Sequence, residues 1–149
     1  MLFANKLIRK FEPVRIYPTE VTLLTAAEYN AYKHNIPPVR DLFWLKSSDV
    51  NPSVVNVVEE SGSVGICNVC FSTGMIRPVI KVDNQLSIGD EYNIKGTMFV
   101  AISKDMLLCK NKIGYGCFRK NFEAEDANVY EKSDVKNYID DWAKEKGIL

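Results

Sequence analysis

Short β-branched segments separated by turn residues run through the middle of the chain, and they constrain its fold more than any other feature. The run Val54–Val58 is followed by Ser61-Gly62-Ser63 and then by a second run over residues 64–71, which predicts a β-hairpin. Further strands are expected over residues 42–46, 75–82, 85–96 and 97–111, with glycine or polar residues at the breaks. The pattern predicts an antiparallel sheet of short strands arranged as a meander.

A capping signal marks the start of a short helix near the N-terminal end of this pattern. Thr25 is followed three residues later by Glu28, which is the spacing of a capping box, and Leu24 and Tyr29 occupy the positions of a hydrophobic staple. The helix must end before Pro37, because proline disfavours helical geometry in the residue before it.

A second helix is predicted at the C-terminal end of the chain. Ser133 is a good N-cap, and the helix is expected to end around Gly147. Apolar residues follow the cap at i, i+3, i+4 and i+7: Val135, Tyr138, Ile139 and Trp142. No repeat or linker divides the 149 residues, so we expect one α+β domain over residues 1–149, with two helices and an antiparallel sheet of short strands.

The charge and the apolar runs exclude several classes of function. Lysine plus arginine equals aspartate plus glutamate at 19 each, so no net field would attract nucleic acid or an anionic membrane. The apolar runs fall far short of the roughly 20 residues that a membrane span needs. The first residues also lack the features of a signal peptide, so we expect a cytoplasmic protein that binds neither nucleic acid nor a membrane.

Four cysteines are the strongest candidates for chemistry. Cys67 and Cys70 have the spacing of a zinc knuckle, but Cys109 and Cys117 do not, and strand positions three apart face opposite sides of a sheet. Free, buried thiols are therefore favoured over zinc. His34 is the only histidine, which excludes a site built on several imidazoles. We expect no enzyme and no cofactor.

The neighbours Phe43 and Trp44 raise a separate question. A strand would point them to opposite faces, and the polar residues 47–53 after them predict an exposed loop. The pattern alone leaves two interpretations open: a binding surface presented by a strand, or a core strand that enters a turn.

Four segments, VTLLTAAEYNAYKHNIP, LFWLKSS, VVEESGSVGI and GMIRPVIKV, resemble the C-terminal half of a family of uncharacterised bacterial and phage domains. That family is related to the C-type-lectin-like fold, which formylglycine-generating enzymes also use. The resemblance covers residues 21–82 and implies that Trp44 lies in the core and that Arg77 and Pro78 are framework residues. The calcium-binding motifs of sugar-binding lectins and the catalytic cysteines of formylglycine-generating enzymes have no counterpart here.

The rest of the chain is similar to the family's N-terminal half, in IGDEYNIKGTMFVAISKDMLLCKN and NVYEKSDVKNYIDDW, but it follows the other half. The resemblance therefore implies a circularly permuted domain, or the end of one copy joined to the start of another. In the permuted domain, the strand over 75–82 pairs with the strand near 92–101, and Met1 lies near the site that the permutation leaves open.

A lectin-like scaffold that holds loops on a rigid sheet implies a non-catalytic protein-binding module. By family analogy the partner is a host protein, which a phage-encoded inhibitor of a host defence would bind. The alternatives are a structural or receptor-binding subunit of a virion that self-associates through edges such as residues 98–102, and a small-ligand pocket. The expected partner-binding residues lie in or beside polar loops: Ser47, Ser48, Asp49, Asn51, Ser53, Glu59, Glu60, Ser61, Ser72 and Thr73.

Overall fold

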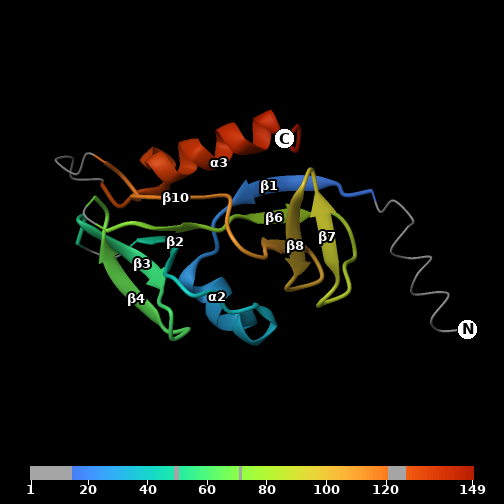
Figure 1. Cartoon of the computed structure of the whole chain (residues 1–149), viewed down its shortest axis with the longest axis horizontal. Helices are drawn as coiled ribbons and strands as arrows, with labels where there is room; N and C mark the ends of the chain where they lie inside the picture. The colour runs from blue at the N-terminus through green and yellow to red at the C-terminus, as the bar shows by residue number, and fades with distance from the viewer. Residues whose placement is uncertain (1–14, 49–50, 71, 121–126) are drawn as a thin grey trace, which may run out of the picture.

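The computed structural model describes residues 15–48, 51–70, 72–120 and 127–149, and of Ser47 and Ser48 it describes only the backbone. Over these residues the chain forms two helices and two five-stranded sheets, which confirms the α+β class. The single meander predicted from the sequence is wrong, because the strands divide between two sheets that lie side by side (Figure 1).

Sheet A is entirely antiparallel, in the order β1-β6-β9-β8-β7. Its strands are β1 (Pro18–Thr22), β6 (Val79–Val82), β7 (Glu91–Ile94), β8 (Thr97–Ala101) and β9 (Met106–Cys109). Sheet B has the order β10-β5-β2-β3-β4, in which only β5 and β2 run parallel. Its strands are β2 (Phe43–Ser48), β3 (Val54–Val58), β4 (Val64–Asn68), β5 (Gly74–Ile76) and β10 (Gly114–Gly116).

Several strand boundaries differ from the sequence-based predictions. The hairpin β3–β4 forms as expected, with Gly62 at φ 89° in its turn, but β4 ends at Asn68 because Val69 and Cys70 turn away. β2 extends to Ser48, two residues into the predicted loop. β10 lies after residue 111, where no strand was predicted.

The segment expected as one strand over residues 75–82 is broken at Arg77 and Pro78. Residues before the break belong to β5 of sheet B, and residues after it belong to β6 of sheet A. Pro78 has no amide hydrogen to donate to a ladder, and its fixed φ lets the chain change sheets at this point. These two residues therefore form the junction between the sheets.

The strand pairing expected for a permuted lectin-like domain is also wrong. β6 pairs with β1 and β9, and β9 separates it from β8. The connection after β6 crosses the β8–β9 turn instead of making a tight hairpin, since the amide of Leu86 donates to the carbonyl of Lys104 over 2.7 Å and that of Gly89 to Ala101 over 2.8 Å. Met1 lies outside the described residues.

The sheets form a middle layer, with helix α3 (Asp134–Glu145) on one face and helix α2 (Ala26–Tyr32) on the other (Figure 1). The α3-side core includes Trp44, Val57, Ile76, Ile80, Phe99 and Leu107, together with Val135 and Ile139 of α3. The α2-side core includes Phe43, Leu45, Val58, Met75, Val79 and Leu108, together with Tyr29 of α2. Phe43 and Trp44 thus point to opposite faces, and both faces are core.

Both helices have the N-terminal caps that the sequence predicts. The Thr25 hydroxyl accepts from the Glu28 amide over 3.1 Å, and the Glu28 carboxylate accepts from the Thr25 amide over 2.9 Å. A 3₁₀ turn, η1 (Lys33–Asn35), then ends the helix before Pro37. α3 follows a second 3₁₀ turn, η2 (Tyr130–Lys132), and the hydroxyl of its cap Ser133 accepts from the Lys136 amide over 2.9 Å. No helix in the described part of the chain is long and apolar enough to cross a bilayer.

Candidate functional site

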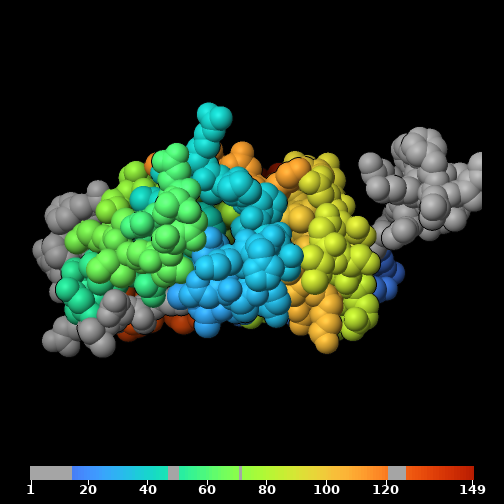
Figure 2. Space-filling view, turned by 90° about the horizontal axis from the view of Figure 1, so that it is seen from below, coloured from blue at the N-terminus to red at the C-terminus, as the bar shows by residue number. Residues whose placement is uncertain are grey.

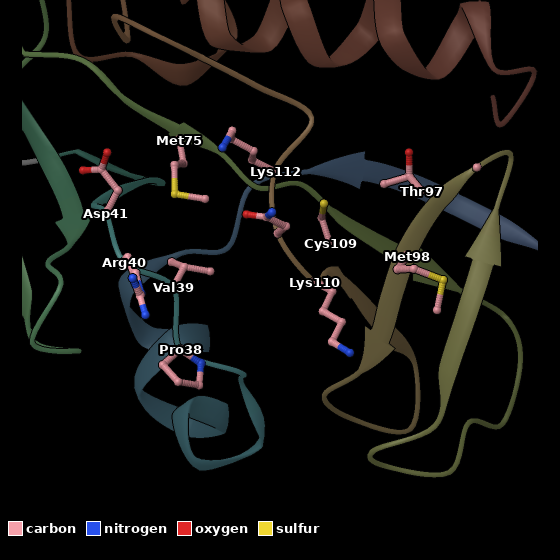
Figure 3. A pocket seen from close by; sticks show the side chains of 12 residues that line it. Pro38, Val39, Arg40, Asp41, Met75, Thr97, Met98, Cys109, Lys110 and Lys112 are labelled. Atoms are coloured by element: carbon pink, nitrogen blue, oxygen red, sulfur yellow. The ribbon is translucent and has the colours of Figure 1, made fainter.

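A groove lies on the α2 side of the middle layer, between the ends of the two sheets (Figure 3). Residues 38–41, which lead into β2, form one wall, and residues 96–98 at the β7–β8 turn form the other. Residues 109–112, at the end of β9 and just after it, complete the lining. The groove has a volume of about 900 Å³. It exists because the chain changes sheets at Arg77 and Pro78 and leaves the sheet ends apart.

The floor of the groove is apolar, whereas its walls carry both apolar and charged side chains. Met75 and Cys109 are buried, and Val39 and Met98 are partly exposed beside them, with Met98 38% exposed. Thioether side chains adapt to differently shaped apolar partners. The floor can therefore pack against aliphatic groups of different shapes, but it does not select among them by a specific polar contact.

Positive charge dominates the rim of the groove. Arg40, Lys110 and Lys112 are all exposed there. Lys110 forms an ion pair with Glu91, but neither Arg40 nor Lys112 has an acidic partner among the described residues. These two cations are far apart in the sequence and lie on different sides of the same opening (Figure 3). The groove therefore favours a negatively charged occupant.

The acidic residue in the groove, Asp41, is already held by neighbouring donors. One carboxylate oxygen accepts from the Leu42 amide over 2.8 Å, and the other accepts from the Tyr115 hydroxyl over 2.7 Å. The Tyr115 bond links the loop before β2 to strand β10. Asp41 thus stabilises the wall, and its charge is partly satisfied by these bonds.

Cys109 is the nucleophilic side chain in this lining, and it is poorly suited to nucleophilic catalysis. Burial raises the pKa of the Cys109 thiol to about 11. A thiol with such a pKa stays protonated near neutral pH, whereas the reactive species is the thiolate. The groove has the character of a binding surface.

The floor is braced by Arg77, whose side chain is 1% exposed. Its Nε donates to the Cys109 carbonyl over 2.7 Å, and Nη2 donates to the carbonyls of Pro37 and Lys110 over 2.8 and 3.1 Å. Its Cζ lies 4.9 Å from the centre of the Phe43 ring. Burial lowers the pKa of Arg77 to about 10, so the side chain is still charged at neutral pH.

The residues predicted to bind a partner do not form one surface. Asn51 and Ser53 lie before β3, where the Asn51 side chain accepts from the Ser53 amide and hydroxyl over 3.0 and 2.7 Å. Glu59, Glu60 and Ser61 are exposed at the other end of the hairpin, six residues further on and therefore roughly 20 Å away.

The other predicted residues are only partly placed. Ser72 and Thr73 precede β5, with Ser72 half-buried and Thr73 exposed. Ser47 and Ser48 belong to β2, and Asp49 lies outside the described residues.

The four cysteines are not gathered into one site. Cys67 lies on β4, Cys109 lies on β9 in the other sheet, and Cys117 donates its thiol hydrogen to the Cys70 carbonyl over 3.1 Å. Within the described ranges, no group of three or more histidine, cysteine, aspartate or glutamate side chains could hold a metal ion. His34 lies on η1 and is exposed.

Sequence reasoning missed the groove because its cations come from separate segments. Arg40 follows the proline pair that stops the first helix, and Lys112 follows β9. Arg40 stands next to Asp41 in a short link, a signal too common to be specific, and Lys112, between Asn111 and Ile113, has no such signal. Comparisons with family models, curated proteins and solved structures find no match to this chain.

Proposed function

We propose that the protein is a non-catalytic protein-binding module that holds an acidic segment of another protein in the groove between its sheets. The observation that carries the proposal is that Arg40 and Lys112, which have no acidic partner among the described residues, lie at the rim of a groove whose apolar lining includes Met75 and Met98. An extended segment with both acidic and aliphatic residues would pair with the rim and cover the floor.

The identity of the partner is a further step of the same proposal. We infer a host protein, bound in the bacterial cytoplasm, with the chain acting as a phage-encoded inhibitor of a host defence. This step rests on the resemblance to bacterial and phage domains alone. The relation to the C-type-lectin-like fold is likewise a proposal supported by the motifs over residues 21–82, without the permuted hairpin that the β6–β9 pairing excludes.

The binding test uses a fluorescein-labelled peptide of repeated Asp-Leu-Glu and fluorescence anisotropy. Reversing both rim charges, in Arg40→Glu with Lys112→Glu, should weaken binding at least about tenfold, and added salt should weaken binding to the wild type. The matched control is Lys104→Glu with Lys144→Glu, which makes the same change in net charge at exposed residues outside the groove. Equal loss in both double variants, or tighter binding of single-stranded DNA than of the peptide, would contradict the proposal.

The loop residues predicted from the sequence remain a second proposed surface for contact with the partner. Glu60→Lys at the hairpin tip changes charge at an exposed position outside the groove. If the hairpin tip contacts the partner captured from bacterial lysate by the wild-type protein, Glu60→Lys should reduce the capture. If only the groove does so, Glu60→Lys should leave it intact.

Self-assembly is the competing proposal, and one observation favours it. β4 is an edge strand of sheet B, and its Ile66 is 53% exposed. Residues 98–102, the edge predicted from the sequence, are not available for self-association. Strand β8 lies inside sheet A, and Phe99 and Ile102 are buried. Light scattering tests the alternative: an ordered oligomer that becomes monomeric in Ile66→Lys would favour a structural subunit.

A further inference from the structure

A second hollow lies between the tip of hairpin β3–β4 and the α2–η1 segment, on the face shown in Figure 2. Its outer part measures about 580 Å³ and is lined by polar residues that include Lys33 and His34. Its inner part measures about 170 Å³ and reaches Arg77. Both parts are lined by Tyr29, Lys33 and Gly62, so they lie next to each other.

Arg77, which lines the inner hollow, is a buried cation without a carboxylate partner among the described residues. The hydrogen bonds of Arg77 all go to neutral carbonyl groups, and no carboxylate among the described residues forms an ion pair with it. The Nη1 atom of Arg77 is buried and finds no hydrogen-bond partner in the described part of the chain. A buried charge without a partner is costly to a fold, as is a buried donor without an acceptor.

The walls of the inner hollow restrict the anion that would fit. Phe43, Val58 and Val39 are apolar, and the space has room for only a few heavy atoms. A carboxylate on a short aliphatic chain would bring an acceptor oxygen to Nη1, because Nε and Nη2 already donate to carbonyl groups, and it would bring an apolar tail to these walls. A phosphate would bring more charge than one buried cation can balance.

We propose that this hollow is a carboxylate-binding site, in which the free Nη1 of Arg77 binds a carboxylate carried on a short aliphatic chain. The carboxylate can belong to a free small acid or to an acidic side chain of another protein. Lys33 lines both parts of the hollow, His34 lines the outer part, and Glu59 and Glu60 line the inner part. The hollow shares Pro38 and Val39 with the groove, but neither Arg40 nor Lys112 lines it, so the site does not depend on the proposed function.

The test follows the Nε–Hε resonance of Arg77 by NMR while sodium acetate or sodium propionate replaces sodium chloride at constant ionic strength. We expect a saturable shift with both acids. Removing a repelling charge in Glu60→Gln should tighten binding about twofold to fivefold, and Lys33→Glu should weaken it by a similar factor. A shift that is linear, or equal to that of a chloride titration, would overturn the proposal. Saturation by phosphate but not by acetate would overturn it as well.

Two further arms keep the test decisive. Arg77→Lys can fail to fold, so Val58→Phe is the second variant: it fills the inner hollow and should abolish acetate binding while the Arg77 resonance persists. Acetate binding that survives in a folded Val58→Phe would overturn the site.

Displacement of acetate by the Asp-Leu-Glu peptide would identify a protein side chain as the source of the carboxylate, and acetate binding without displacement would identify a free acid. Reversal at Arg40 and Lys112 should leave acetate binding unchanged, which separates this site from the groove.

Discussion

The indole nitrogen of Trp44 donates a hydrogen bond to the carbonyl of Gly116 over 2.8 Å, although strand β5 lies between their strands. The indole reaches Gly116 by passing Gly74 of β5, which is the register partner of Gly116. A Cβ placed on Gly74 would lie 3.0 Å from the indole nitrogen. The ring also packs against Phe118, with their centres 5.7 Å apart. Trp44 therefore ties three strands of sheet B together.

Replacing Trp44 by phenylalanine should lower the free energy of unfolding by about 2 to 4 kcal/mol. The change leaves the Gly116 carbonyl without its donor and opens a cavity in the α3-side core. Urea denaturation followed by circular dichroism measures the effect. Tyr115→Phe is the control, because it also removes one side-chain hydrogen bond but at a residue 49% exposed, and it should cost less than about 1 kcal/mol.

Two glycines that pair across β5 and β10 should respond differently to alanine. At Gly74 a methyl group would meet the buried indole of Trp44 at 3.0 to 3.1 Å and the Leu42 side chain at 2.5 Å, so we expect a loss of about 1 to 3 kcal/mol. At Gly116 a Cβ would meet nothing within 4 Å, so alanine should change stability by less than about 1 kcal/mol in either direction. Equal effects in thermal or urea unfolding would show that the indole does not limit the space at Gly74.

The sequence predicted the elements that depend on local chemistry. The hairpin at residues 54–68 follows from β-branched runs around Gly62, and both helices follow from their caps at Thr25 and Ser133. The break at Arg77 was hidden because the alternation of apolar residues continues through it. Met75 and Val79 face the α2-side core, whereas Ile76 and Ile80 face the α3-side core.

The pairing of strands and the candidate sites could not be predicted in the same way. Both faces of the sheets are covered, so the apolar pattern of β6 does not indicate whether β8 or β9 lies next to it. The groove and the Arg77 hollow depend on how distant segments meet, and Arg77 in the sequence is only one cation beside a proline.

The capping box at the start of α2 should contribute to stability in a pH-dependent manner. Thr25→Ala should cost about 1 kcal/mol, because the Glu28 amide loses its acceptor. Burial tends to raise the pKa of Glu28, but the Thr25 amide and Lys81, 3.1 Å from the carboxylate, lower it overall. A carboxyl group with a lowered pKa in the folded state stabilises the fold above its unfolded pKa, and this contribution is lost as the pH falls through the folded value.

Glu28→Gln separates the charge from the hydrogen bond. The amide oxygen can still accept from Thr25, but the ion pair with Lys81 is lost. The variant should be less stable than the wild type at pH 7, and the difference should disappear in acid below the folded pKa of Glu28. A difference that persists unchanged into acid would mean that the charge of Glu28 is not responsible.

Cys109 should make the protein sensitive to alkali. Burial raises the pKa of this thiol from 9.0 to about 11, so between these values the unfolded chain releases a proton that the folded chain keeps. Stability therefore falls as the pH rises through this window, by roughly 2 to 3 kcal/mol in total. Arg77 acts in the opposite direction above its pKa of about 10, because the folded state loses its proton first. Cys109→Ala removes the thiol and keeps Arg77, so its stability should fall less than that of the wild type between pH 9 and 11. Cys117→Ala is the matched control and should behave as the wild type does, since it leaves Cys109 in place. Urea unfolding at a series of pH values measures all three proteins, and parallel curves for the wild type and Cys109→Ala would rule out the Cys109 thiol as the cause.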